Sequence, residues 1–354
     1  MFNRIKILLK FSKMLSDLNS GSPEGMIQLT GQGAVADLES KFKKHYGYQY
    51  ALSFSSATNA MTAVVDCLNI YDSEIITTPF NYYASMGGLM LFGNTSVFVD
   101  TFDDLTINPE QAEKAITKRT KALLAVDFAG NPHDTNEIRK LCDKYQMLYI
   151  ADAAQSFGAR CHEIPASSLA DVLIVSLTTG KTLTAGEGAC ILMNDFTLYE
   201  KLLQFTHPIR TKIELGLNRH SEMIYMNGRI NPFGAILANE NFGLALRNLA
   251  KHQKKSLQNT EALKDFDSIS NPEIRGTSTY FYQFAYTSNG LNSENIDNLL
   301  NRYSPRFTID FVVPFEPLYN HPTLRDKFRS KVRIEGCKNA EECFQRMFMI
   351  TNML

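Results

Sequence analysis

The sequence predicts an α/β protein in which a large domain, built on a mostly parallel sheet of about seven strands, precedes a smaller α+β domain. Two observations predict this doubly wound class. Between residues 50 and 193, short apolar runs rich in β-branched residues alternate with helical patterns, as in βαβ units. After residue 195 the alternation fades, and an aromatic segment follows a helical one.

The elements of the large sheet are expected where apolar runs meet turn signals. Helices are expected at Ala57–Leu68, Pro109–Ile116 and Asn136–Lys144, and Asn108 and Asp134 are placed to cap the last two. The expected strands are Tyr50–Phe54, Glu74–Thr78, Ser96–Asp100, Lys121–Asp127, Met147–Ala151, Asp171–Ser176 and Ala189–Met193.

The remainder of the chain predicts a smaller unit. Asn231-Pro232 opens a helix expected to run through Ala250, followed by an aromatic strand at Thr279–Ser288 and a helix around Ser293–Arg302. We therefore expect a large domain over residues 1–250 and a small domain over residues 251–354. Apolar residues between positions 2 and 18 have near-helical spacing, which predicts an amphipathic helix packed on the body, with the small domain as one candidate surface.

Composition excludes several classes of protein. The 354 residues carry a net charge of −1, with 44% hydrophobic and 21% charged residues, so the chain is neither a disordered protein nor a typical nucleic-acid binder. Four basic residues interrupt the apolar runs at the N-terminus, which argues against a signal peptide, and no apolar run is long enough for a membrane helix. The six cysteines form no CxxC pair and no Cys/His cluster, which predicts reduced thiols, a cytoplasmic location and no metal.

Small and hydroxylated residues follow the first expected strand. Ser55, Ser56, Ala57 and Thr58 lead from that strand into a helix, where accessible backbone N–H groups and the helix N-terminus suit a phosphate. When the segment is taken alone, a simple helix cap is the better explanation of the same residues.

A carboxylate lies at the end of the strand expected at Met147–Ala151. Asp152 is one residue past it, and Gln155 follows three residues later. This carboxylate could coordinate a metal, accept a proton or pair with a cationic ring nitrogen, and a helix cap or salt bridge is the structural alternative. A metal is the least favoured of these because no histidine lies at ligand spacing.

A lysine lies in a loop that contains several glycines. Ser176 closes an apolar strand, and Lys181 follows five residues later. Lysines are usually solvated, but one that is buried in a cleft at a strand end loses pKa and becomes a nucleophilic amine able to form a Schiff base.

These three strand ends share one edge of the predicted sheet and supply complementary chemistry. A phosphate cradle, a strand-end carboxylate and a loop lysine together are what pyridoxal 5'-phosphate requires. The lysine would hold the aldehyde as an imine, the carboxylate would keep the ring nitrogen protonated, and the cradle would anchor the phosphate.

The motifs resemble those of the DegT/StrS-type sugar aminotransferases, pyridoxal-phosphate enzymes with the aspartate-aminotransferase fold. Five ordered segments carry this resemblance from about residue 31 to the segment after residue 227. They are SSAT, TTPFNYYAS, DFAGNPHD, ADAAQSFGA and the S-x4-K-x5-EG loop.

The resemblance implies a role for each matching residue. Lys181 would form the Schiff base and move protons, Asp152 would pair with the pyridinium nitrogen, and Gln155 would hydrogen-bond the phenolate oxygen. The residues assigned to the phosphate are Ala57, Thr58 and Ser176, and Tyr82 would stack on the cofactor face. Asn227 would reach the phosphate of a neighbouring subunit, which implies a homodimer with shared active sites.

Two further residues are candidates for substrate contacts. Arg229 would bind a carboxylate, although a structural ion pair explains it equally well. Asn81 replaces the threonine usual in the family beside the stacking aromatic residue and would contact substrate.

The resemblance implies a ping-pong aminotransferase. Glutamate would donate the amino group to a keto-sugar, most simply a nucleotide-linked one. Lys181 argues against the deoxygenating relatives, which have histidine at this position. The alternatives are a catalytically inactive or regulatory protein of this fold, and an aminotransferase or lyase that acts on a non-sugar cyclic ketone.

Overall fold

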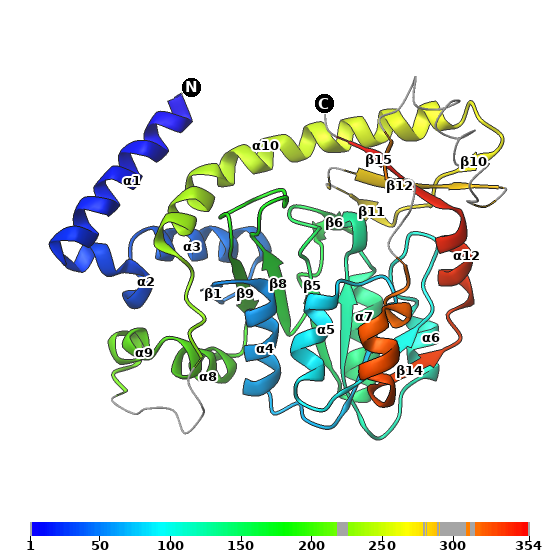
Figure 1. The fold of residues 1–354 in the computed structure, drawn as a ribbon, viewed down its shortest axis with the longest axis horizontal. Helices are drawn as coiled ribbons and strands as arrows, with labels where there is room; N and C mark the ends of the chain where they lie inside the picture. Colours follow the sequence, from blue (N-terminus) through cyan, green and yellow to red (C-terminus); the bar gives the residue numbers. More distant parts are fainter. Residues whose placement is uncertain are drawn as a thin grey trace.

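The computed structural model describes residues 2–217, 226–278, 280, 282–288, 290, 309–311 and 316–352. In this part of the chain, an eight-stranded sheet forms the centre of the molecule and a four-stranded sheet lies to one side of it (Figure 1). The long helix α10 (Pro232–Leu263) crosses above the large sheet toward the small one.

The large sheet has the order β1-β9-β8-β5-β4-β2-β3-β14. Strand β9 runs antiparallel to both of its neighbours, and the remaining neighbouring pairs are parallel. The strands are β1 Tyr50–Phe54, β2 Glu74–Thr77, β3 Thr95–Val99, β4 Thr120–Val126, β5 Leu148–Asp152, β8 Val172–Ser176, β9 Ala189–Met193 and β14 Val332–Glu335. The seven expected strands are therefore confirmed to within one residue at each end.

The eighth strand comes from far along the chain. Strand β14 pairs in parallel with β3, although its residues lie in the segment assigned to the small domain. The chain thus returns to the edge of the large sheet after leaving it. The division at residue 250 stays a prediction.

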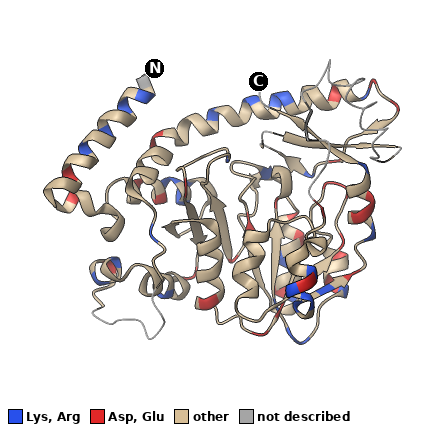
Figure 2. Ribbon diagram, viewed as in Figure 1, with Lys and Arg blue, Asp and Glu red and all other residues tan. Residues whose placement is uncertain are grey.

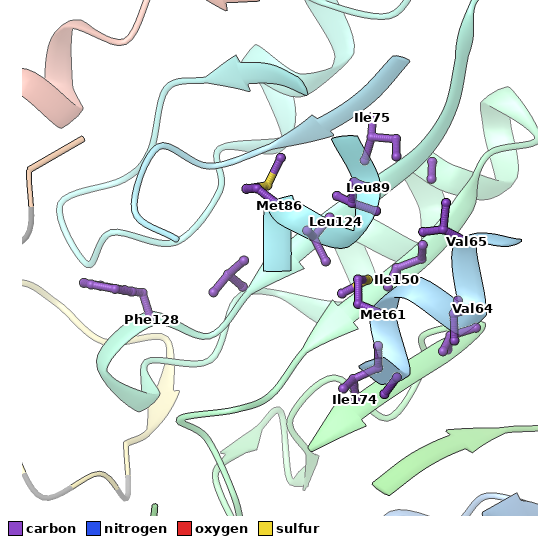
Figure 3. Packing of buried hydrophobic residues seen from close by; sticks show 14 of the residues in the cluster. Met61, Val64, Val65, Ile75, Met86, Leu89, Leu124, Phe128, Ile150 and Ile174 are labelled. Atoms are coloured by element: carbon purple, nitrogen blue, oxygen red, sulfur yellow. The ribbon is translucent and has the colours of Figure 1, made fainter. Parts of the chain in front are cut away.

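Helices cover both faces of the large sheet, as its nearly continuous buried strands require. One face packs against α4 (Ala57–Cys67), α5 (Tyr83–Met90) and α8 (Phe196–Thr206). Figure 3 shows part of this core, where Met61 of α4 and Leu89 of α5 lie close to strand residues of the sheet. The opposite core includes residues of α3 (Ala34–Tyr46), α6 (Pro109–Lys114), α7 (Thr135–Tyr145) and α10.

The helix caps predicted at Asn108 and Asp134 are confirmed, and Asn231 caps the helix that it was expected to open. Asn108 accepts hydrogen bonds from the first turn of α6, Asp134 does so for α7, and Asn231 does so for α10. Helix α10 continues well beyond the expected end at Ala250. Its second half lacks glycine and proline and buries Leu263 against the small sheet, so tertiary packing extends the helix.

The small sheet has the order β10-β12-β15-β13, with every neighbouring pair antiparallel. Its strands are β10 Ile269–Ser270, β12 Tyr282–Thr287, β13 Ile309–Phe311 and β15 Met347–Thr351, and α12 (Lys338–Arg346) leads into β15. The expected aromatic strand, Thr279–Ser288, is thus found in its central part as β12, and its residues 279 and 281 lie outside the described residues. The helix expected around Ser293–Arg302 lies outside the described residues.

The N-terminal helix α1 (Phe2–Ser20) packs along α10. Glu240 forms ion pairs with Lys6 and Lys10, at 2.7 and 2.5 Å, and the rings of Phe11 and Phe233 meet edge to face. The expected helix is therefore found, and it contacts α10, but Leu8, Leu9 and Leu15 remain exposed, so only part of the predicted apolar face is covered. Acidic and basic residues are interspersed along the ribbon of the molecule (Figure 2), in keeping with the net charge of −1.

The remaining described elements are short. They are α2 Ile27–Thr30, α9 Pro208–Leu215, the strands β6 Arg160–Cys161, β7 Ile164–Pro165 and β11 Gly276–Thr277, and the single turns Pro23–Met26, Phe128–Gly130, Leu318–Asn320, Thr323–Lys327 and Arg329–Lys331.

Candidate active site

A cavity of about 480 Å³ lies at the carboxyl ends of the parallel strands, where open α/β sheets bind their ligands. Residues at the ends of β4, β5 and β8 line it, and so do residues of β12 and β15 in the small sheet. Eight of the ten predicted site residues lie in its wall: Ala57, Thr58, Asn81, Tyr82, Asp152, Gln155, Ser176 and Lys181.

The N-terminus of α4 forms one end of the cavity. Ser56 caps the helix by accepting a hydrogen bond from the backbone N–H of Asn59, and Ala57 and Thr58 form the first turn. Their N–H groups have no acceptor within the helix, which makes this end suitable for an anion. Ala57 is absent from the residues with positive φ, so alanine is accommodated here without backbone strain.

Ser176, the last residue of β8, lines the same cavity as this helix end. Its hydroxyl accepts a long hydrogen bond, 3.4 Å, from the backbone N–H of Thr178. Its own proton therefore remains to be donated to a ligand.

Asp152 is the last residue of β5 and is buried. Its carboxylate accepts hydrogen bonds from the Ser85 hydroxyl at 2.5 Å and from the backbone N–H of Ala154 at 2.9 Å. Burial raises the pKa of Asp152, while those two hydrogen bonds and the charge of Lys181 oppose the rise. A cationic group entering the cavity would favour the ionised carboxylate further.

Lys181 lies in the loop after β8, in the wall of the same cavity as Asp152. Burial lowers the pKa of the Lys181 amine, and the charge of Asp152 acts in the opposite direction. The Lys181 Nζ lies 5.9 Å from the centre of the Tyr280 ring. A lysine in such surroundings supplies more neutral amine at neutral pH than a solvated one does.

Gln155 reaches the cavity from the turn after β5. Its side-chain oxygen accepts hydrogen bonds from the backbone N–H of Ala129 at 2.8 Å and from the Tyr282 hydroxyl at 3.2 Å. The amide nitrogen is therefore the end of the side chain that can donate to a ligand.

Asn81 and Tyr82 line the cavity at the start of α5. Asn81 is buried, and its amide nitrogen donates to the Thr77 hydroxyl while its oxygen accepts from the backbone N–H of Tyr82. Tyr82 is about half exposed, and its ring lies against that of Tyr83 with centroids 4.1 Å apart. Its stacking on a cofactor stays a prediction.

Asn227 and Arg229 lie outside the cavity wall. Asn227 is exposed, and Arg229 forms an isolated antiparallel bridge with Phe54, the last residue of β1. Neither residue joins the other eight within this chain. Their predicted roles, toward a second subunit and a substrate carboxylate, stay predictions.

Sequence reasoning missed Ser85, Tyr280 and Tyr282. Ser85 lies in the TTPFNYYAS segment, but the helix that turns it toward Asp152 was not expected. Tyr280 and Tyr282 alternate in an aromatic strand, a signal that predicts a strand face but not the site which that face meets.

The described part of the chain contains neither a cluster of metal-ligating side chains nor a membrane-spanning helix. No group of three or more histidines, cysteines, aspartates or glutamates among those residues is placed to hold a metal ion. None of the helices described is both long and apolar enough to cross a membrane. All six cysteines are free and buried.

Comparison with known proteins identifies several similar chains. The model of the DegT/DnrJ/EryC1/StrS aminotransferase family matches residues 16–353. A UDP-4-amino-4,6-dideoxy-N-acetyl-beta-L-altrosamine transaminase of Helicobacter pylori is 32% identical over 162 residues, which cover 45% of this chain and 43% of that protein. The aligned segment thus spans less than half of that relative.

Two further matches extend over most of the chain. A UDP-2-acetamido-2-deoxy-3-oxo-D-glucuronate aminotransferase of Pseudomonas aeruginosa is 28% identical over 299 residues, covering 83% of this chain and 80% of that one. Among solved structures, the E. coli GDP-4-keto-6-deoxy-D-mannose-3-dehydratase with bound hydrated pyridoxal phosphate matches with a TM-score of 0.78 and 20% identity, covering 98% of this chain and 93% of the other. This second match concerns the fold.

Proposed function

Because the chain belongs to the DegT/DnrJ/EryC1/StrS aminotransferase family, we propose that it is a pyridoxal-phosphate-dependent aminotransferase that transfers an amino group from glutamate to a nucleotide-linked keto-sugar. One observation supports this most strongly: Lys181, Asp152 and the N-terminus of α4 line a single cavity. These groups match the aldehyde, the ring nitrogen and the phosphate of the cofactor in chemical character.

The residues present fit the cofactor. When bound, pyridoxal phosphate supplies an aldehyde that condenses with amines and a ring that accepts electrons. The first-turn N–H groups of Ala57 and Thr58 and the Ser176 hydroxyl would hold its phosphate. Asp152 would accept a hydrogen bond from the protonated ring nitrogen, and the Gln155 amide would donate to the ring oxygen.

Lys181 is assigned the covalent attachment and the proton transfers. Its lowered pKa favours the neutral amine, which can act as a nucleophile and as a general base near neutral pH. Because the reactive groups share one cavity, the donor and the acceptor would occupy it in turn, which is a ping-pong scheme.

A nucleotide-linked keto-sugar is proposed as the acceptor because the curated relatives carry names of nucleotide-sugar transaminases. A homodimer is proposed because Asn227 is exposed and lies outside the cavity of its own chain, where it is available to a second subunit.

The first experiment adds pyridoxal phosphate and then glutamate alone to the purified protein. We expect a visible absorption band that declines on addition of glutamate, with one equivalent of 2-oxoglutarate released per site. Lys181→Ala should abolish turnover, whereas Lys144→Ala, which removes an exposed lysine paired with Glu113, should not. A colourless wild type that releases no 2-oxoglutarate would contradict the proposal and favour an inactive or regulatory protein.

A second experiment addresses the acceptor. The protein is first treated with pyridoxal phosphate and glutamate, so that it carries the amino group. It is then incubated with each of a panel of nucleotide-linked keto-sugars and with a cyclic keto acid, and the aminated product is measured. Amination of a nucleotide-linked sugar is the expected result. Amination of the cyclic keto acid alone would contradict the sugar assignment while leaving the transaminase intact.

A further inference from the structure

Gln155 is held by two donors at the same atom. The backbone N–H of Ala129 and the hydroxyl of Tyr282 both point to its side-chain oxygen, at 2.8 and 3.2 Å. A backbone N–H can only donate, so it determines which end of the amide is the oxygen. Rotating the amide by half a turn would place its NH₂ against the Ala129 N–H, which cannot accept a hydrogen bond, so this contact opposes the flip. The Tyr282 hydroxyl adds a second hydrogen bond to the oxygen in the observed orientation.

The second donor comes from a different sheet than the glutamine does. Gln155 follows β5 of the large sheet, whereas Tyr282 is the first residue of β12 in the small sheet and pairs there with Thr351. Tyr282 is only 6% exposed, and its ring packs edge to face against those of Tyr280 and Phe284. These rings belong to the core between the small sheet and one face of the large sheet, and this packing holds the Tyr282 ring in place.

Tyr282 is also suited to remain a donor at all working pH values. Burial raises the pKa of Tyr282 above its ordinary value, and the charge of the neighbouring Tyr280 and a hydrogen bond with its side chain add to the rise. The phenol therefore keeps its proton, and the oxygen of Gln155 lies 3.2 Å away as an acceptor.

We propose that Tyr282 is a positioning residue, whose hydroxyl holds Gln155 so that the amide N–H is presented to the ring oxygen of the cofactor. The small sheet thereby contributes to the electronic state of the cofactor without touching its reactive atoms. This inference rests on the proposed function, because it assumes that pyridoxal phosphate occupies the cavity.

The test compares Tyr282→Phe with Tyr286→Phe. Both tyrosines lie on β12, both are buried, and each donates through its hydroxyl, Tyr286 to the backbone oxygen of Asp103 instead of to the site. The two variants lose the same atom from the same strand. A merely structural effect of losing a hydroxyl would therefore appear in both.

Two properties of the bound cofactor are measured by titration. The first is the dissociation constant for pyridoxal phosphate, and the second is the pH midpoint at which its visible band changes. For Tyr282→Phe we expect weaker binding by roughly two- to tenfold, the effect of one hydrogen bond. We also expect a higher pH midpoint, because a less firmly presented donor leaves more negative charge on the ring oxygen, which stabilises a nearby proton. Tyr286→Phe should leave both quantities unchanged.

A double variant tests whether Tyr282 acts through Gln155. In a Gln155→Met background, Tyr282→Phe should cause no further change in either quantity, because the group that it positions is already gone. An equal effect in both backgrounds would overturn the inference. The inference would also be overturned if Tyr282→Phe left the dissociation constant and the pH midpoint unchanged, or if the two tyrosine variants shifted them equally. A wild-type protein that binds no pyridoxal phosphate would overturn the proposed function together with this inference.

Discussion

At the scale of the residue, burial moves the pKa values of the two central groups in opposite directions. It raises the pKa of Asp152 and lowers that of Lys181, so both groups are less charged than they would be in water. Each partly offsets the shift of the other, as expected of a carboxylate and an amine that face one cavity. Binding of a charged ligand would therefore be favoured, because it would supply an opposite charge to a group whose ionised form is destabilised by burial.

Asp152→Asn provides a prediction with a pH dependence. A raised carboxyl pKa means that the folded chain holds the proton more tightly than the unfolded chain, so stability is lost as the pH rises from about 3.8 through the folded pKa. We expect the cofactor-free variant to be more stable than the wild type at pH 7.5 and the difference to shrink toward pH 4. Urea unfolding at several pH values measures this.

The same variant should behave differently as an enzyme. Loss of a charge-assisted hydrogen bond to the ring nitrogen should lower turnover by roughly 10- to 150-fold. Unchanged turnover in Asp152→Asn would contradict the assigned role, and a stability gain that is constant with pH would contradict the pKa argument.

Gly130 provides a second prediction at this scale. It has a φ of +74°, and an added Cβ would lie 2.7 Å from the Tyr280 Cβ and 2.8 Å from the backbone oxygen of Gln155. Gly130→Ala should therefore destabilise the protein by about 1–3 kcal/mol and weaken cofactor binding. Thermal unfolding and a pyridoxal phosphate titration measure the two effects.

Gly47→Ala is the matched control for this variant. Gly47 has a similar φ of +81°, but an added Cβ would meet nothing within 4 Å. It should show the backbone strain without the effect on the cofactor. Equal cofactor binding in the two variants would contradict the argument from contacts.

At the scale of the element, a buried ion pair joins α3, α9 and β1. Arg210 of α9 donates two hydrogen bonds to the carboxylate of Glu39 in α3, at 2.9 and 2.8 Å, and Glu39 also accepts from the backbone N–H of Ser53 in β1. Both side chains of the pair are 5% exposed. Arg210 also forms an ion pair with Glu214, at 2.5 Å, so it is the removal of Arg210 that would leave Glu39 as an uncompensated charge in the core.

Arg210→Leu tests this arrangement. We expect a loss of about 3–5 kcal/mol in the free energy of unfolding, measured by urea titration, because Glu39 stays buried without its partner. Adding Glu39→Gln to this variant should recover part of the loss. For comparison, Lys144→Met, which removes one partner of an exposed ion pair, should lower the free energy of unfolding by less than about 1 kcal/mol. An equally small loss for Arg210→Leu would contradict the importance assigned to burial.

At the scale of the whole molecule, the two sheets are joined by a chain that passes between them repeatedly. Helix α10 leads from the large sheet to the small one, β14 returns to the edge of the large sheet, and β15 ends at the centre of the small one. Tyr282 and Met349 of the small sheet also line the cavity. The site is therefore complete only when both sheets have formed.

Subunit mixing tests whether the site also needs a second chain. If Asn227 serves the partner, a heterodimer of Lys181→Ala and Asn227→Ala chains contains one intact site. Refolding the two variants together in equal amounts should recover roughly a quarter of wild-type activity, since half of the dimers are mixed and half of their sites are intact. Assays at limiting cofactor measure this, and activity no higher than that of the separately refolded variants would contradict shared sites.

Much of this arrangement could be predicted from the sequence because its signals are local. The strand boundaries follow from short apolar runs, and the caps at Asn108, Asp134 and Asn231 follow from side chains that bond their own helix. The residues that line the cavity could be predicted because open α/β sheets bind their ligands at the carboxyl ends of parallel strands. Local patterns sufficed wherever the interacting residues are close along the chain.

The sequence by itself determined the α/β class, the order of the strands along the chain and the chemical types of the residues at their ends. Only the tertiary structure decided that β9 lies antiparallel between β1 and β8, that β14 joins β3, and that Tyr282 donates to Gln155. These contacts join residues far apart along the chain. An alternating pattern predicts that a strand has a buried face, but which element packs against that face depends on the packing of the whole chain.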